Sequence, residues 1–434
     1  IDDIFLGGSN TSESQLLLSR KDGYSLTNNS ALIQDKKYED LGAHFFDANG
    51  DGIKDLYIAS GGGGEIEEYQ ELTQDRLYLI DKDGNFTNAS QNLPPIASST
   101  KAIVSADFDQ DGDFDLIIGG RNKPGAYPSS SKTYYLENNG GVFRDRSKKM
   151  FPDIDGMISD IEAIDFNNDE YLDVIVTSEW SAPFVLIYEN GVFNYQDIEQ
   201  LKDHSGWWQS VKVADLDNDG DQDIILGNMG LNNKFHPSQD KPLGVLASDF
   251  DETGTLDIVL TKKYNGNTVP VRGKECSSAQ MPMISEKFPT YEGFATSTIE
   301  EILGEDKIKN ADSKKVVDFS SYYMINENGE YRLERLPYQA QQFPIMDAEV
   351  LDVNQDGRND IILVGNKLGS EPETPSYDAG TGLVLINGEN GFTVEQNINK
   401  TGILAKFDAR NIKKINLGNG QEGIVIANNN GPLQ

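Results

Sequence analysis

Cysteine is almost absent from this chain of 434 residues, in which Cys276 stands alone. A single cysteine excludes an internal disulfide framework and a four-cysteine zinc site. Histidine is nearly as scarce, and His44, His204 and His236 lack the spacing of metal ligands. His204 precedes Ser205, but adjacency in sequence does not provide the geometry of a catalytic triad.

Basic residues and long apolar runs are also lacking. The chain has 37 Lys and Arg against 71 Asp and Glu, a net charge of −34. Binding to a phosphate backbone needs a basic surface, so nucleic acid is not an expected partner. No run of 18 apolar residues occurs, so no transmembrane helix is expected. Hydrophobic residues make up 37% and aromatic residues 9%, which favours a folded core over disorder.

No signal peptide is visible at the start of the sequence. The opening "IDDIFLGG" matches the end of later repeats such as "DFDLIIGG". We therefore expect the first repeat to be truncated and the chain to be a piece of a longer precursor.

An acidic loop followed directly by an apolar strand occurs six times. The clearest copy is "DFDQDGDFDLIIGG" (107–120), and the others begin at Asp47, Asp165, Asp215, Asp249 and Asp352. Clustered carboxylates repel one another, so this arrangement calls for a counter-charge. In the pattern D-x-D-x-D-G-x-x-D, the first, third, fifth and ninth side chains and the seventh carbonyl can converge on one cation.

The predicted metal ligands are therefore five residues in each loop. They are Asp47, Asn49, Asp51, Ile53 and Asp55; Asp107, Asp109, Asp111, Asp113 and Asp115; Asp165, Asn167, Asp169, Tyr171 and Asp173; Asp215, Asp217, Asp219, Asp221 and Asp223; Asp249, Asp251, Thr253, Thr255 and Asp257; and Asp352, Asn354, Asp356, Arg358 and Asp360. Glycine at the sixth position permits the sharp turn. Because Glu170 replaces that glycine and Thr253 replaces a carboxylate, we expect these two loops to bind more weakly.

Several structural Ca²⁺ ions are the predicted cofactors. An EF-hand would need a glutamate at the twelfth loop position and flanking helices. That position holds Ile58, Ile118, Val176, Leu226, Leu260 or Leu363, and the loops continue into strands. Mg²⁺ prefers fewer protein ligands and more water. The remaining alternative is six Asp- and Asn-rich turns without an ion.

Between the acidic loops lie hairpin signals such as "VLIYENGVFNYQD" (185–197) and "SYYMINENGEYRLER" (321–335). Asn-Gly and Gly-Gly pairs flanked by aromatic or β-branched residues are typical of hairpin turns. Each unit thus supplies four antiparallel strands, the pattern of a propeller blade. Continuous apolar runs such as "DLIIGG" indicate strands buried on both faces.

The fold prediction is an all-β propeller of four-stranded antiparallel blades occupying residues 1–434 as one domain. Only 34 residues separate Asp223 from Asp257, so the count is seven blades if these repeats share strands, or eight otherwise. We expect seven. A long insert is predicted at 264–316, with a short helix within 296–311, and the C-terminal strands are expected to close the ring beside the N-terminal segment.

The repeats resemble the FG-GAP or VCBS repeat, the calcium-loop blade also found in integrin alpha-chain heads. Stretches outside the loops, including "HSGWWQS" (204–210), "NMGLNNKF" (228–235) and "QMPMISEKFPTY" (280–291), resemble the C-terminal propeller of bacterial VCBS proteins related to the ASPIC/UnbV group. The resemblance implies a secreted or outer-surface bacterial protein with a non-enzymatic role, and it carries the calcium positions over loop by loop.

The expected function is therefore a calcium-stabilised binding, adhesion or scaffold module for a protein or glycan at the cell surface. Trp207 and Trp208 are either core residues or an aromatic platform for a sugar or peptide. The loop 119–130, with Arg121, Lys123 and Tyr127, is either functional or a plain connector. The insert could be a lid, a docking arm or a cap. The enzyme alternative is a calcium-dependent polysaccharide lyase using Tyr, Arg and His at the ring mouth.

Overall fold

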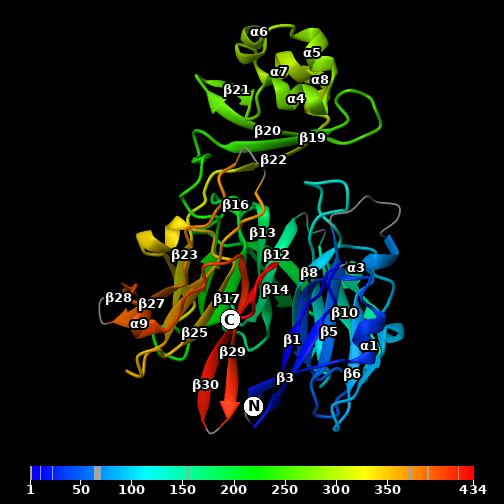
Figure 1. The fold of residues 1–434 in the computed structure, drawn as a ribbon, viewed down its shortest axis with the longest axis vertical. Coiled ribbons are helices and arrows are strands. Elements are labelled where there is room, and N and C mark those ends of the chain that lie inside the picture. The colour runs from blue at the N-terminus through cyan, green and yellow to red at the C-terminus, as the bar shows by residue number, and fades with distance from the viewer. Residues whose placement is uncertain are drawn as a thin grey trace.

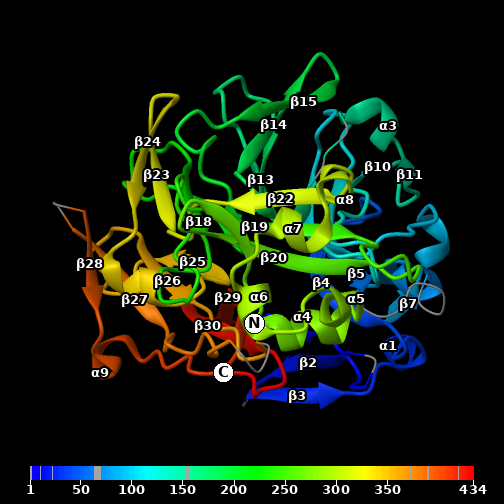
Figure 2. The same cartoon turned by 90° about the horizontal axis from the view of Figure 1, so that it is seen from above.

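The computed structural model describes residues 2–9, 11–21, 23–62, 70–152, 154, 156–370, 374–388, 391–418 and 420–434. Antiparallel sheets form a ring, and a smaller unit of strands and short helices stands over one end of it (Figure 1). Figure 2 shows this end: the sheets are arranged in a circle, and β19, β20, β22 and the short helices of the smaller unit lie across its opening. The prediction of an all-β propeller is confirmed.

Five sheets of the ring contain the four antiparallel strands predicted for a blade, and one of them has β16 (Gly206–Trp207) as a fifth strand. They consist of β4 (Glu39–Phe46), β5 (Asp55–Gly61), β6 (Arg76–Ile80) and β7 (Phe86–Asn88); β8 (Thr100–Ala106), β9 (Asp115–Gly120), β10 (Tyr134–Glu137) and β11 (Arg144–Asp145); β12 (Met157–Ile164), β13 (Asp173–Ser181), β14 (Phe184–Glu189) and β15 (Val192–Asp197); β17 (Ser210–Ala214), β18 (Asp223–Gly227), β23 (Tyr322–Glu327) and β24 (Glu330–Arg335); and β25 (Asp347–Leu351), β26 (Asp360–Val364), β27 (Leu383–Gly388) and β28 (Gly391–Glu395). The first strand of each sheet packs against the first strand of the next.

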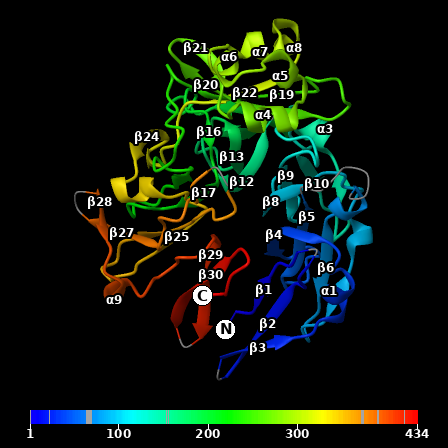
Figure 3. The same cartoon turned by 45° about the horizontal axis from the view of Figure 1, so that its top comes forward.

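Two smaller sheets complete the ring where the chain ends meet (Figure 3). One has β1 (Ile4–Leu6), β2 (Gln15–Arg20) and β3 (Gly23–Thr27), and the other has β29 (Ala409–Gly418) and β30 (Gln421–Asn428). The Asp2 N–H donates to the Asn416 carbonyl at 3.0 Å, and the Asn416 N–H donates to Asp2 Oδ2 at 2.7 Å. The predicted meeting of the C-terminal strands with the N-terminal segment is therefore confirmed.

The described residues thus place seven sheets around the ring, the favoured number, although two of these sheets have fewer than four strands. The predicted hairpin at 321–335 forms β23 and β24, and its turn residues Asn328 and Gly329 have φ of 58° and 92°. A hairpin signal of the same kind, "GLVLINGENGFTVEQ" (382–396), includes residues 389 and 390, which lie outside the described residues.

The insert is larger than the predicted 264–316. It leaves the ring after β18 and returns at β23, which pairs with β18 in the same sheet. It therefore spans residues 228–321, and the Asp249 loop belongs to it rather than to a blade. Its elements are β19 (Leu243–Ser248), β20 (Asp257–Tyr264), β21 (Asn267–Pro270), β22 (Asp312–Val316), α4 (Lys274–Gln280), α5 (Met283–Lys287), α6 (Tyr291–Ala295), α7 (Ile299–Leu303) and α8 (Glu305–Lys309).

The single helix predicted within 296–311 is two helices, α7 and α8. Thr298 and Glu301 form a capping box at the start of α7. Gly304, with φ of 94°, ends α7 and begins α8, because no residue with a side chain adopts that conformation readily. None of the helices in the described ranges has the length and apolarity needed to cross a bilayer.

The remaining helical turns are short and lie on the connections. They are α1 (Ser30–Gln34), α3 (Ser147–Met150), α9 (Ile398–Thr401) and the 3₁₀ turns η1 (Gln70–Thr73), η2 (Ser90–Asn92) and η3 (Tyr338–Gln342).

In the five larger sheets of the ring, the second strand is buried on both faces, as its apolar run predicted. In β9, for example, Leu116, Ile117 and Ile118 are at most 1% exposed. Removing each such side chain from water stabilises the fold by about 1.5–3 kcal/mol. Successive sheets share these cores, so each sheet depends on its neighbours for burial.

A further apolar cluster joins the insert to the ring. Leu243 and Val245 of β19 and Val316 of β22 pack with Met157 and Trp180 from the ring. Because all five side chains are buried, the insert is docked against the mouth of the ring. This packing fixes the position of the Asp249 loop relative to the ring.

Candidate metal centre

All six acidic loops share one backbone conformation. Their fourth and sixth residues have positive φ: Gly50 and Gly52, Gln110 and Gly112, Asn168 and Glu170, Asn218 and Gly220, Glu252 and Gly254, and Gln355 and Gly357. The sharp turn that glycine permits at the sixth position is present in all six loops, and Glu170 adopts the same conformation with φ of 71°. The left-handed fourth residue was not predicted, because four residue types occupy that position.

The first aspartate of each loop turns inward and caps the loop's own backbone. One of its oxygens accepts the N–H of the sixth residue at 2.8–3.1 Å, and this holds for Asp47, Asp107, Asp165, Asp215, Asp249 and Asp352. Such bonds satisfy the tight turn without an ion. They therefore account for the loop's shape but not for the clustering of further carboxylates.

The ninth aspartate clamps three parts of its sheet together. In five of the six loops its Oδ2 accepts the N–H of the second loop residue, as in Asp223 and Leu216 at 2.6 Å, whereas Asp115 Oδ2 accepts the Tyr135 hydroxyl. In the five ring loops its Oδ1 accepts an N–H from the third strand or just beyond it, at 2.7–2.8 Å, from Ile80, Asn138, Tyr188, Asn326 and Asn387. Sequence reasoning assigned this aspartate to the metal only. The sequence signal for this second role was the asparagine that recurs in three outer hairpins, as Asn138, Asn326 and Asn387.

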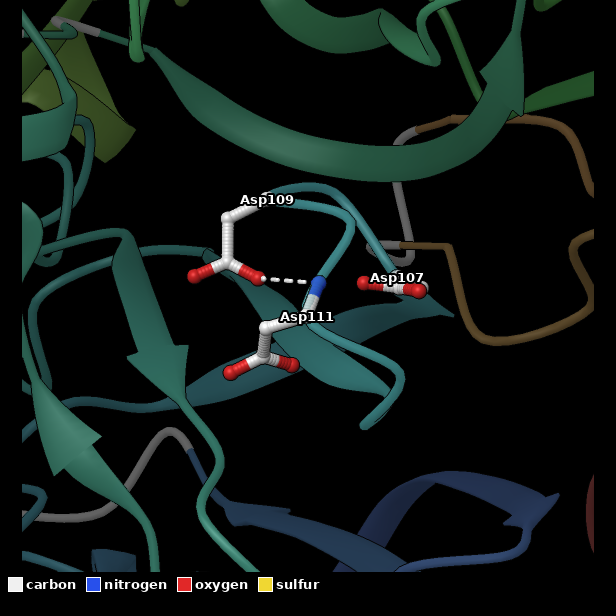
Figure 4. Close-up of side chains that lie close together, drawn as sticks. All are labelled: Asp107, Asp109 and Asp111. Atoms are coloured by element: carbon white, nitrogen blue, oxygen red, sulfur yellow. Dashed lines mark hydrogen bonds between the residues drawn. The ribbon is translucent and has the colours of Figure 1, made fainter.

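In three loops, three carboxylates approach within 4.8 Å of one another. These groups are Asp107, Asp109 and Asp111; Asp215, Asp217 and Asp223; and Asp249, Asp251 and Asp257. Figure 4 shows the first group, in which the Asp111 N–H donates to Asp109 Oδ1 at 3.3 Å. The other three loops carry Asn at the third position, and no such group forms there among the described residues. The Thr253 loop, predicted to be weak, nevertheless brings its carboxylates together.

The second loop contains a polar atom that lacks a partner. Asp107 Oδ1 is buried and, within the described part of the chain, has no hydrogen-bond partner. Leaving a buried carboxylate oxygen unpaired costs on the order of 1–3 kcal/mol. A cation held by Asp107, Asp109 and Asp111 would remove that cost, so these residues fit a divalent ion.

Several of the buried ninth aspartates have pKa values above the usual range for a carboxyl group. Burial raises the pKa of Asp115 to about 7, and the charges of Asp109 and Asp111 act in the same direction. Hydrogen bonds from the Tyr135 hydroxyl and the Asn138 N–H oppose this shift. Burial likewise raises the pKa of Asp173 and of Asp223 to about 6. A bound cation would offset the same repulsion.

The ring loops of neighbouring sheets contact one another. The Asn359 side chain donates to the Asp215 carbonyl at 2.7 Å, and the Asn218 side chain donates to the Gly357 carbonyl at 3.0 Å. All five connect the first and second strands of their sheets, so they lie at one end of the ring. The Asp249 loop is different, because the insert leaves from a connection between second and third strands at the opposite end.

The two adjacent tryptophans have different environments. Trp208 is fully buried and its indole N–H donates to the His204 carbonyl at 3.1 Å, so the core interpretation is correct for it. Trp207 belongs to β16 (Gly206–Trp207), which pairs with β13, and its side chain is only partly buried. Of the two tryptophans, only Trp207 therefore stays open to the platform interpretation.

The loop 119–130 contributes a salt bridge and an aromatic contact at the same end of the ring. Arg121 pairs with Glu179 at 2.7 Å, and the Tyr127 hydroxyl accepts the Trp180 indole N–H at 2.6 Å. These contacts tie the loop to β13.

The histidines occupy three separate environments. Burial lowers the pKa of His44 to about 4, and its Nε2 lies 2.8 Å from Ser105 Oγ. His204 Nδ1 lies 2.8 Å from Asp318 Oδ2, whereas His236 is exposed. None of them joins the carboxylate groups of the loops.

Comparison with known proteins identifies the repeats. The model of the family described as "FG-GAP-like repeat" matches residues 47–118 and 165–226, which contain the first four acidic loops. No curated protein matches the sequence.

Three solved structures illustrate the overall similarity. BBS1N in complex with ARL6DN is 10% identical, with 91% of each chain covered and a TM-score of 0.35. The V. cholerae biofilm matrix protein Bap1 is 10% identical, with 98% of this chain and 84% of that chain covered and a TM-score of 0.30. The Trypanosoma rangeli sialidase is 12% identical, with 74% and 49% covered and a TM-score of 0.30. The ring of sheets is that of a β-propeller, and residues 47–118 and 165–226 within it match the FG-GAP-like repeat.

Proposed function

We propose that the acidic loops hold structural Ca²⁺ ions. The observation that carries this is the unpaired, buried Asp107 Oδ1 beside the carboxylates of Asp109 and Asp111. Ca²⁺ binds six to eight oxygens in flexible geometry, so it suits loops whose carboxylates already accept backbone N–H groups. The ion would neutralise clustered charge at the point where the ninth aspartate joins three segments of a sheet.

We further propose that the propeller is a non-catalytic binding, adhesion or scaffold module for a protein or glycan partner. Its place would be the surface of a bacterium or the medium around it, as the resemblance of the repeats suggests. The rigid docking of the insert on the ring mouth supports recognition, because a preformed surface loses little entropy on binding.

One cluster favours the lyase alternative at first sight. Asp318 lies between His204 and Tyr322, and the Arg335 side chain donates to the Tyr322 hydroxyl at 3.4 Å. However, burial and the hydrogen bond to Asp318 raise the pKa of Tyr322. A catalytic base needs a pKa near the working pH, so this shift is in the wrong direction.

Two measurements test the proposal. Native mass spectrometry and calorimetric titration should show Ca²⁺ binding that Asp107→Asn reduces by one ion and Asp240→Asn, at an exposed site outside the loops, leaves unchanged. The fluorescently labelled chain should bind bacterial cells saturably in Ca²⁺ and lose that binding in EGTA. The absence of bound Ca²⁺ would refute the metal assignment. Calcium-dependent release of unsaturated sugars from polysaccharides would refute the non-catalytic assignment.

A further inference from the structure

A cavity of about 660 Å³ lies between the ring mouth and the insert. The ring contributes Tyr127 and Trp207, whereas the insert contributes apolar residues of β20 and the acidic loop before it. This volume is within the range of small-molecule sites, which combine apolar walls with a few polar groups. The cavity is at the end of the ring opposite the five ring loops.

The aromatic wall of the cavity is rigidly held. Trp207 packs on Trp180, Phe235 and Phe319, with ring centroids 5.2, 5.7 and 5.0 Å away. Trp180 in turn fixes Tyr127 through its indole N–H. Trp180 also has φ of 70°, an outlier for a bulky residue. Such strain costs on the order of 1–3 kcal/mol and is concentrated at functional sites.

Trp207 has a donor without an acceptor. Its indole Nε1 is buried and has no hydrogen-bond partner in the described part of the chain. The other two indoles are satisfied, Trp180 by the Tyr127 hydroxyl and Trp208 by the His204 carbonyl. Among the described residues, Trp207 is therefore the tryptophan whose indole N–H lacks an acceptor, which is costly for a buried donor.

The polar wall of the cavity includes Asp251 and Asp257 from the acidic loop of the insert. Asp251 accepts a hydrogen bond from the Thr253 hydroxyl at 2.8 Å, and Asp257 accepts the Phe250 N–H at 2.9 Å. These carboxylates are therefore already partly satisfied by neutral donors. Arg272 also lines the cavity, and its charge opposes a cationic ligand. A basic peptide side chain thus fits less well than a neutral group that both donates and accepts.

We propose that this cavity binds a neutral saccharide. An apolar face of a sugar ring would lie on Trp207 and Tyr127, and its hydroxyls would meet the opposite wall at Asp251 and Asp257, whose charge the Ca²⁺ ion proposed for the Asp249 loop would offset. This inference rests on the proposed binding function and names its site and ligand class. It assigns to the insert a role in forming one wall of that site.

Fluorine NMR of the protein labelled with 5-fluorotryptophan tests the proposal, because the chain has only three tryptophans. Trp207→Phe assigns the relevant resonance. Cellohexaose, mannohexaose, xylohexaose and laminarihexaose are each titrated to about 5 mM, which would half-saturate sites with millimolar Kd. At least one should shift the Trp207 resonance and leave that of Trp208 in place.

A matched pair of variants separates the cavity from the surface. Tyr127→Ala should weaken the saccharide about tenfold, the effect of losing one aromatic contact. Tyr264→Ala removes an aromatic residue that is 62% exposed and belongs to the insert but not to the cavity, and it should leave the affinity unchanged. Equal weakening by both variants would overturn the proposal.

The proposal is also overturned if no hexasaccharide shifts the Trp207 resonance, or if hexalysine shifts it and the saccharides do not. This failure is distinct from failure of the proposed function. Saturable, calcium-dependent cell binding that persists in Tyr127→Ala, together with silent saccharide titrations, would reject the cavity and retain the binding module.

Discussion

Removal of calcium should lower the melting temperature of the propeller, and the size of the decrease should be proportional to the number of loops that hold an ion. An ion that binds only the folded state at 100 times its Kd stabilises that state by about 2.7 kcal/mol. The three loops with converging carboxylates would together contribute about 8 kcal/mol. Unfolding entropy of about 2.1 cal/mol/K per residue gives about 0.9 kcal/mol/K for 434 residues.

These values predict that EGTA lowers the melting temperature by about 9 °C if three loops are occupied, and by about 18 °C if all six are. Differential scanning calorimetry in excess Ca²⁺ and in EGTA measures the shift. Asp107→Asn keeps the size of the side chain but removes its charge, so it should reduce the three-loop shift by about one third.

Asp240→Asn is the control for this experiment, because Asp240 is exposed and lies outside every loop. A melting temperature that is the same in Ca²⁺ and EGTA would show that the loops are turns without ions. Equal effects of Asp107→Asn and Asp240→Asn would show that the stabilisation comes from general charge screening.

Three further predictions concern single residues. Asp111→Ala should lower the free energy of unfolding in Ca²⁺ by about 2.7 kcal/mol, because an ion is lost. Thr253→Ala should lower it by about 1 kcal/mol, because one hydrogen bond is lost. Denaturant titration measures both values, and equal costs would refute the ranking. Glu170→Gly should raise the free energy of unfolding by about 1 kcal/mol, because Glu170 has φ of 71°. Gly112→Glu should lower it by a similar amount, and opposite signs in the same denaturant titration would contradict the conformational argument. Burial raises the pKa of Asp75 to about 7 from 3.8, so the folded state binds the proton more tightly and its stability falls as pH rises between these values. Between about pH 4 and pH 7 the wild type should lose roughly 3 kcal/mol more than Asp75→Asn, and parallel pH profiles would refute this.

The sequence by itself determined the repeat, the strand order within a unit and the loop positions. A period of two in one strand, an apolar run in the next and Asn-Gly turns between strands are local signals, so they survive without tertiary information. Glycine at the sixth loop position was readable for the same reason, since it reports a backbone angle rather than a contact. These local rules correctly gave an all-β propeller.

The tertiary structure alone decided which repeat stands outside the ring. The loop at Asp249–Asp257 looks like the others because its local hydrogen bonds are the same, and only the pairing of β18 with β23 places it in the insert. The predicted insert boundary at 264 failed for this reason.

The tertiary structure also decided which oxygens converge and which atoms lack partners. Within the described part of the chain, Asp107 Oδ1 and Trp207 Nε1 are buried without a hydrogen-bond partner, and no pattern along the sequence reports this. The cavity joins Tyr127, Trp207 and Asp251, which are separated by long stretches of chain. Local sequence therefore determined the strands and loops of each repeat. Long-range packing determined the metal group and the cavity, because burial and proximity depend on how the repeats assemble.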